Sequence, residues 1–249
     1  MNAEIIWLGA VASLAAGLAT GAGALPVLFT RRISDRLLDV MLGFSAGVML
    51  AATSFSLIVP AIDLGGLWVA VFGLALGAFV LHLVDRFIPH FHQYIGAEGP
   101  PSKLSRVWLF VIAITIHNFP EGLAVGVSFG SGEVAAGLVI AMAIGLQNMP
   151  EGLAVALPLL REHYSRGKSL WYATLTGLVE PVGGLLGVAL ISIFQPILPW
   201  GLAFAAGAML FVVSDEMIPE SHRKGFAREA TFGLIIGFVV MMFLDSFFT

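Results

Sequence analysis

The chain has 249 residues, of which 58% are hydrophobic and only 11% are charged. This balance excludes an ordinary soluble domain and indicates an integral membrane protein. The net charge is −4 and the twelve basic residues are spread thinly, which excludes a nucleic-acid-binding surface. The absence of cysteine excludes a disulfide framework and a thiolate metal site.

Apolar runs of about 20 residues, the length that crosses a bilayer as a helix, occur eight times along the chain. We predict one helix from each run, at residues 5–29, 37–60, 65–87, 106–129, 133–159, 169–194, 198–219 and 229–247. Almost no chain is left for a soluble domain, so residues 1–249 are predicted to form a single polytopic membrane domain. The first run lacks the basic start of a signal peptide, and we expect it to be retained.

The basic residues predict the orientation of these helices. All twelve lie in or beside the loops that follow the first, third, fifth and seventh runs. By the positive-inside rule these loops are cytoplasmic, and both termini lie outside. The longest loop, residues 88–104, contains Gly96, Gly99, Pro100 and Pro101 and is predicted to be irregular. The short chain favours a cell membrane, either a bacterial inner membrane or a plasma membrane.

Two internal repeats relate distant helices. Residues 113–125 closely resemble residues 143–155, and residues 43–50 more weakly resemble residues 203–210. Each pair lies an odd number of helices apart, so each would be inverted in the membrane, which is typical of transporters. We therefore predict an all-α membrane protein with eight transmembrane helices in a 3+2+3 arrangement with inverted repeats. For the weaker pair, convergence of small-residue helices by composition is the alternative.

The stronger repeat carries metal-ligand residues to membrane depth. On the fourth helix, His117 and Glu121 are four residues apart on one face, and Asn118 adjoins that face. Intramembrane carboxylates are costly and by default indicate a functional site. The fifth helix repeats the pattern with three further residues, Gln147, Asn148 and Glu151.

Prolines within these helices add possible ligands. Pro120 and Pro150 each free a backbone carbonyl one turn earlier. Glu180, followed by Pro181, brings a third carboxylate to mid-membrane on the sixth helix. No Lys or Arg lies at that depth, so we predict one or two divalent cations as the counter-charge. Nitrogen and oxygen ligands without thiolate suit Zn²⁺, Cd²⁺, Fe²⁺ or Mn²⁺; the alternative is that the polar groups only hold the fourth and fifth helices together.

The motifs His-Asn-x-Pro-Glu-Gly and Gln-Asn-x-Pro-Glu-Gly, with Glu-Pro on the sixth helix, resemble the ZIP (Zrt/Irt-like) family, nearest to its GufA-like bacterial branch. The resemblance implies metal uptake toward the cytoplasm through a binuclear site, by elevator-like motion of helices one, four, five and six. One metal would take His117, Glu121, Gln147 and Glu151. The second would take Asn118, Glu121, Asn148, Glu151 and Glu180, with Glu121 and Glu151 bridging. Some relatives have Asp in place of Asn148, so the second site here carries less charge.

Weaker metal candidates lie toward the predicted cytoplasmic side. Asp85 ends the third helix, His90 and His92 follow in the long loop, and Asp215 and Glu216 lie near the end of the seventh helix. The resemblance implies an exit or metal-sensing site in these regions. The alternatives are a solvated loop for the histidines and a helix end anchored at the interface for the carboxylates.

We expect a transporter and not an enzyme, with divalent metal ions as substrate, the lipid bilayer as surroundings, and no organic cofactor or nucleic acid. An intramembrane metal-dependent enzyme is one alternative, although the chain lacks a His-Glu-x-x-His pair. A channel-like metal pore is another. Small residues on the second and third helices fit either a homodimer contact or internal packing.

Overall fold

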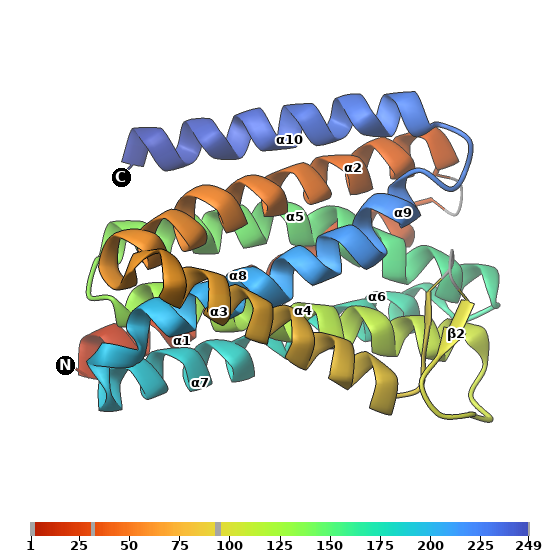
Figure 1. The fold of residues 1–249 in the computed structure, drawn as a ribbon. Coiled ribbons are helices and arrows are strands. Elements are labelled where there is room, and N and C mark those ends of the chain that lie inside the picture. Colours follow the sequence, from red (N-terminus) through yellow and green to blue (C-terminus); the bar gives the residue numbers. More distant parts are fainter. Residues whose placement is uncertain (1–2, 31–32, 93–95, 249) are drawn as a thin grey trace.

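A computed structural model describes residues 3–30, 33–92 and 96–248. The fold is all-α apart from one short hairpin (Figure 1). Within the described chain, seven helical segments are long and apolar enough to cross a membrane. The elements are α1 (Ala3–Ala24), α2 (Asp35–Ala51), α3 (Val59–Phe87), β1 (His90–His92), β2 (Gly96–Glu98), α4 (Arg106–Gly130), α5 (Val134–Arg161), α6 (Arg166–Gly177), α7 (Glu180–Ile193), α8 (Leu198–Val212), α9 (Ile218–Ser221) and α10 (Ala227–Phe248), with short 3₁₀ or π segments η1 (Leu25–Leu28), η2 (Ala52–Ile58), η3 (Gln195–Ile197) and η4 (Val213–Met217) between them.

One of the seven segments, Asp35–Phe87, holds two of the predicted helices. It has 53 residues, so as a straight helix it would measure about 80 Å, far more than the hydrocarbon core of a bilayer. Gly66 interrupts it with φ 79° and ψ 168°, a backbone conformation that only glycine adopts readily. The chain reverses its direction at this kink, so α2 and the part of α3 after Gly66 run in opposite senses (Figure 1).

Two predicted helices are interrupted where prolines follow. The predicted helix at 169–194 is divided into α6 and α7, because Pro181 cannot donate a backbone hydrogen bond. The predicted helix at 198–219 contains the π-helical segment η4 just before Pro219. A matching π-helical segment, η2, lies just before Pro60, so each π segment follows one copy of the weaker sequence repeat.

The prediction of an irregular loop at 88–104 is wrong in part. Strands β1 and β2 pair antiparallel, with His90 opposite Glu98. Gly96 and Gly99 have positive φ, at 109° and 76°, and this lets the chain leave the strand at both ends of β2. The glycines and prolines correctly predicted the turns, but they gave no indication of the short pairing of β1 with β2.

The helices form two bundles, which we name by their content. The site bundle contains α1, α4, α5, α6 and α7, and the flanking bundle contains α2, α3, α8, α9 and α10. Inside each bundle, glycines let backbones touch: Gly122 lies against the Glu180 carbonyl, and Gly47 against the Leu234 carbonyl. None of the described glycines has such a backbone contact across the seam between bundles, where Gly201 meets Val127 only through side-chain atoms.

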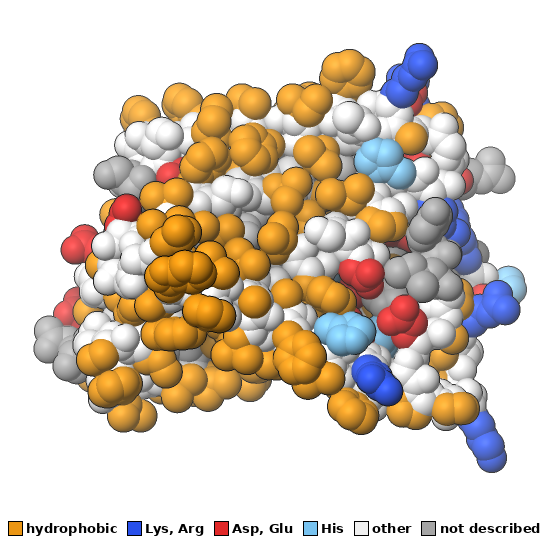
Figure 2. Space-filling view, viewed as in Figure 1, with side chains coloured by type: hydrophobic (Ala, Val, Ile, Leu, Met, Phe, Trp, Pro, Cys, Tyr) orange, Lys and Arg blue, Asp and Glu red, His pale blue; other side chains and the backbone are white. Residues whose placement is uncertain are grey.

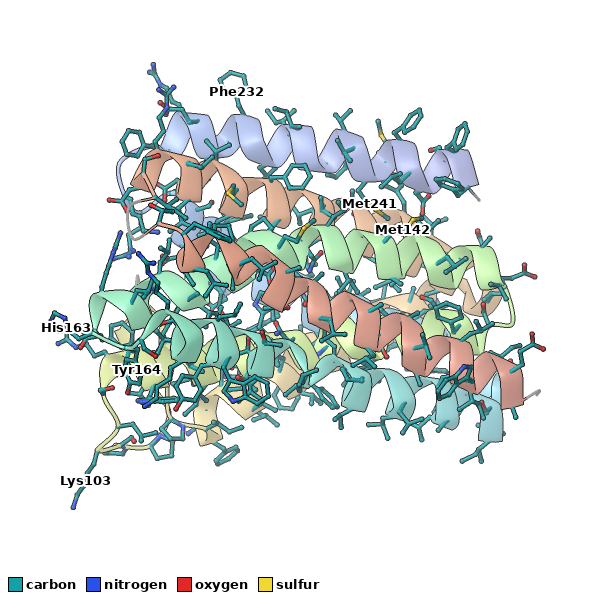
Figure 3. All side chains as sticks on the ribbon, turned by 180° about the vertical axis from the view of Figure 1, so that it is seen from behind. Lys103, Met142, His163, Tyr164, Phe232 and Met241 are labelled. Carbon is teal, nitrogen blue, oxygen red and sulfur yellow. The ribbon has the colours of Figure 1, made fainter. Side chains whose placement is uncertain are left out.

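Both chain ends lie at one end of the molecule (Figure 1). Lys and Arg side chains gather at the opposite end, and hydrophobic side chains cover much of the surface between the two ends (Figure 2). Lys103 and His163 project from this basic end in the reverse view of Figure 3. Arg31 and Arg32, which contributed to the predicted orientation, lie outside the described residues.

Candidate metal centre

Three potential metal ligands converge between α4 and α5. His117, Glu121 and Glu151 each offer an atom within 4.8 Å of the others. The His117 Nε2 atom lies 3.3 Å from Glu121 Oε1 and 3.8 Å from Glu151 Oε2. The first pair shares a helix face because the two residues are four apart, and the third residue comes from the facing helix. All three side chains are buried.

Two amide side chains connect this trio to its surroundings. The Gln147 amide donates a hydrogen bond to Glu121 Oε1. Asn148 Nδ2 donates to Glu180 Oε1 at 2.6 Å and to the Ala16 carbonyl at 2.8 Å. The predicted residue Glu180, at the start of α7, is therefore joined to α5 through Asn148. Asn118 is also fully buried on α4.

These seven side chains hold a concentration of unsatisfied polar atoms. Leaving a buried donor or acceptor without a hydrogen bond costs about 1–3 kcal/mol, and native proteins keep such groups few unless a function requires them. Several unpartnered carboxylate and amide oxygens in one place form an oxygen-rich cage that suits a cation. Within these seven side chains, the buried atoms without a hydrogen-bond partner in the described chain are His117 Nδ1 and Nε2, Asn118 Nδ2 and Oδ1, Glu121 Oε2, Gln147 Oε1, Asn148 Oδ1, Glu151 Oε1 and Oε2, and Glu180 Oε2.

A hydroxyl from the flanking bundle supports the cage from outside. Ser45 on α2 donates a hydrogen bond of 2.7 Å to the backbone carbonyl of Gln147. This carbonyl is next to that of Leu146, which loses its helical donor because Pro150 has no N–H. Nothing in the sequence singled out Ser45, because a serine in a small-residue helix has many ordinary packing roles.

Glu216 lies deeper than its predicted place at a helix end. It belongs to η4, its side chain is only 10% exposed, and its Oε2 atom lies 3.7 Å from His117 Nδ1. The flanking bundle thus contributes a carboxylate to the cage. Asp215 and Glu216 line a cavity that also contains Glu151 and Glu220, so the interpretation of the pair as an interfacial helix anchor is wrong for Glu216.

A second cluster joins α3 to the hairpin. His90 Nε2 lies 3.7 Å from Asp85 Oδ1 and 3.8 Å from Glu98 Oε2. His90 and Asp85 are buried, which excludes a solvated loop position for this histidine. Glu98 was missed by sequence reasoning, because only the strand register places it opposite His90. The side chain of His92 lies outside the described residues.

Comparison with known proteins identifies the family. Residues 97–245 match the family model described as ZIP Zinc transporter. The chain is 50% identical to Zinc transporter GufA of Myxococcus xanthus, over 95% of this chain and 97% of the relative. It is 48% identical to Zinc transporter ZIPB of Bordetella bronchiseptica, over 96% and 80%, and 36% identical to Zinc transporter ZIP11 of Homo sapiens, over 91% and 93%.

These similarities cover nearly the whole chain and include both helices of the cage. They confirm the resemblance that the Asn-x-Pro-Glu-Gly motifs indicated, and they confirm the prediction of a non-enzymatic membrane protein. The chain belongs to the ZIP zinc transporter family.

Proposed function

We propose that this protein carries Zn²⁺, or a chemically similar divalent ion such as Cd²⁺, Fe²⁺ or Mn²⁺, into the cytoplasm through a binuclear cage. The observation that carries the proposal is the convergence of His117, Glu121 and Glu151 in a fully buried position. The relatives named as zinc transporters favour zinc as the substrate. Imidazole nitrogen with carboxylate oxygen is a common ligand set for Zn²⁺.

Within the cage, we assign two subsites that share the carboxylates of Glu121 and Glu151. Unpartnered amide and carboxylate oxygens beside both carboxylates support this division. Two divalent ions would balance the buried negative charge, which a low dielectric does not tolerate alone. The first subsite comprises His117, Glu121, Gln147 and Glu151. The second comprises Asn118, Glu121, Asn148, Glu151 and Glu180.

The same proposal includes eight membrane crossings by a single membrane domain. The interruption at Gly66 supports counting Asp35–Phe87 as two crossings, and termini at one end of the molecule require an even number. The basic end then faces the cytoplasm and both termini face outside, in a bacterial inner membrane or a plasma membrane. The equivalent π segments η2 and η4 support inverted repeats in a 3+2+3 arrangement.

We further propose that the site bundle moves against the flanking bundle. Backbone contacts at glycines hold the helices of the site bundle close together and, in the flanking bundle, the pairs α2–α10 and α3–α8, whereas side chains separate the two bundles at the seam. Most cage residues belong to the site bundle, so its displacement would carry the ions with it. Saturation and counterflow kinetics would distinguish this carrier from a channel-like pore.

The direct test is uptake into proteoliposomes with Zn²⁺ or Cd²⁺ outside and a fluorescent chelator inside. Glu121→Ala removes a ligand shared by both subsites, and we expect uptake to fall by at least about 100-fold with folding intact. Glu4→Ala, which removes an exposed carboxylate of α1, is the matched control and should transport normally. Normal flux in the Glu121 variant would contradict the cage.

A further inference from the structure

One small cavity is lined both by Glu151 of the cage and by Glu220 of α9. It is lined by four carboxylates, from Glu151 and Glu216 beside His117 to Asp215 and Glu220. The remaining lining is largely apolar and includes Leu42, Phe110, Ala113, Ile114 and Met217. Because each carboxylate attracts a divalent ion, an ion leaving the cage would be retained unless the last carboxylate has another partner.

Two cations flank this carboxylate, and the more buried of them is a lysine. Lys224, in the turn between α9 and α10, places its Nζ atom 3.4 Å from Glu220 Oε1. The same Nζ atom lies 3.8 Å from Oδ1 of Asp39 on α2. The Lys224 side chain is 11% exposed and that of Asp39 is fully buried. One ammonium group is therefore shared between a carboxylate that lines the cavity and one that lies behind it.

Asp39 and Glu220 differ in the number of basic side chains beside them. Within the described chain, Lys224 is the basic partner of Asp39, and a buried carboxylate that loses its counter-charge is strongly destabilised. Glu220 has a second cation, because Arg223 Nε lies 3.2 Å from Glu220 Oε2 on a side chain that is 34% exposed. Lys224 can thus leave Glu220 without leaving the buried charge of Asp39.

We propose, on the basis of the metal-uptake function above, that Lys224 is a tethered counter-cation that competes with the departing metal ion for Glu220. Lys224 neutralises Glu220 when no ion is near, and it moves onto Asp39 when an ion occupies Glu220. Its return displaces the ion into the cytoplasm. A lysine suits this role because its charge is compact and its stem is flexible.

The test compares charge-removing and charge-keeping variants in the proteoliposome assay. Lys224→Gln should lower both kcat and KM for Zn²⁺, each by about fivefold to tenfold, the scale of one charge pair near 4 Å. Lys224→Arg keeps the charge and should transport nearly normally. Arg228→Gln, which removes an exposed charge four residues away, is the control. Adding Glu220→Gln to Lys224→Gln should restore kcat, whereas a merely structural role of Lys224 would not allow this rescue.

An unchanged kcat in Lys224→Gln, or a loss that Glu220→Gln does not rescue, would overturn the proposal. If Lys224→Gln does not fold because Asp39 is left unpaired, the double variant Asp39→Asn/Lys224→Gln should show the same slow release. Absence of uptake by the unaltered protein would instead refute the transport function. Cd²⁺ titration of the purified protein would then still test the role of Lys224. The Lys224→Gln variant must bind Cd²⁺ about fivefold more tightly. An unchanged Cd²⁺ affinity would refute competition between Lys224 and the metal ion.

Discussion

The two proposed subsites differ in what already occupies their ligands. In the first, the Gln147 amide donates to Glu121 within the subsite, and His117 lies at ion-pair distances from Glu121 and Glu151. In the second, Asn148 donates to both Glu180 and the Ala16 carbonyl. The first subsite is thus prepared for a cation, whereas the second also joins α1, α5 and α7.

This difference indicates that an uncharged residue has a structural use at position 148. Its amide group satisfies Glu180 and a carbonyl of α1 with one nitrogen, and its oxygen stays unpartnered in the described chain. An aspartate there would add charge for a metal but could not donate these hydrogen bonds. We therefore expect the two subsites to respond differently to substitution.

The largest effect is expected from His117→Ala. This variant removes the imidazole of the first subsite, and metal affinity should fall by at least about 100-fold, because even weaker outer contacts are worth 10–100-fold. Cd²⁺ titration of the purified protein measures the loss, and uptake should fall in parallel. His82→Ala, an exposed histidine of α3, is the control. An equal loss of metal affinity in His117→Ala and His82→Ala would contradict the assignment of the His117 imidazole to the cage.

An intermediate effect of mixed sign is expected from Asn148→Asp. The added charge should tighten binding of the second ion by about tenfold, on the scale of one nearby charge. Without metal, the same variant should unfold at lower temperature, because the donor to Glu180 and Ala16 is lost. Metal titration measures the gain in affinity, and thermal unfolding without metal measures the loss of stability. Tighter binding without a loss of stability would show that the hydrogen bonds of Asn148 are unimportant.

The smallest effect is expected from Ser45→Ala, which leaves both subsites intact. Removing its hydrogen bond to the Gln147 carbonyl should lower the free energy of unfolding by about 1 kcal/mol, with metal affinity unchanged. Ser54→Ala, which removes a hydroxyl that donates to the Leu50 carbonyl one turn earlier, is the matched control. A large loss of metal affinity in the Ser45 variant would mean that the flanking bundle orients the ligands.

Sequence alone determined the class of the protein and the core of its candidate metal site. Long apolar runs cross a bilayer whatever their neighbours are, and residues four apart share a helix face by local geometry, as His117 and Glu121 do. The duplicated motif then indicated that α4 and α5 contribute matching ligands, and His117, Glu121 and Glu151 do converge.

Only the tertiary structure decided which distant groups approach this core. Glu216 reaches His117 from the flanking bundle, and Glu98 lies opposite His90 through the hairpin register. Lys224 lies between Asp39 and Glu220 because a turn returns the chain to the start of α2. Periodicity describes positions within one helix, whereas contacts between helices depend on crossing angles, π segments and glycine contacts that act over the whole fold.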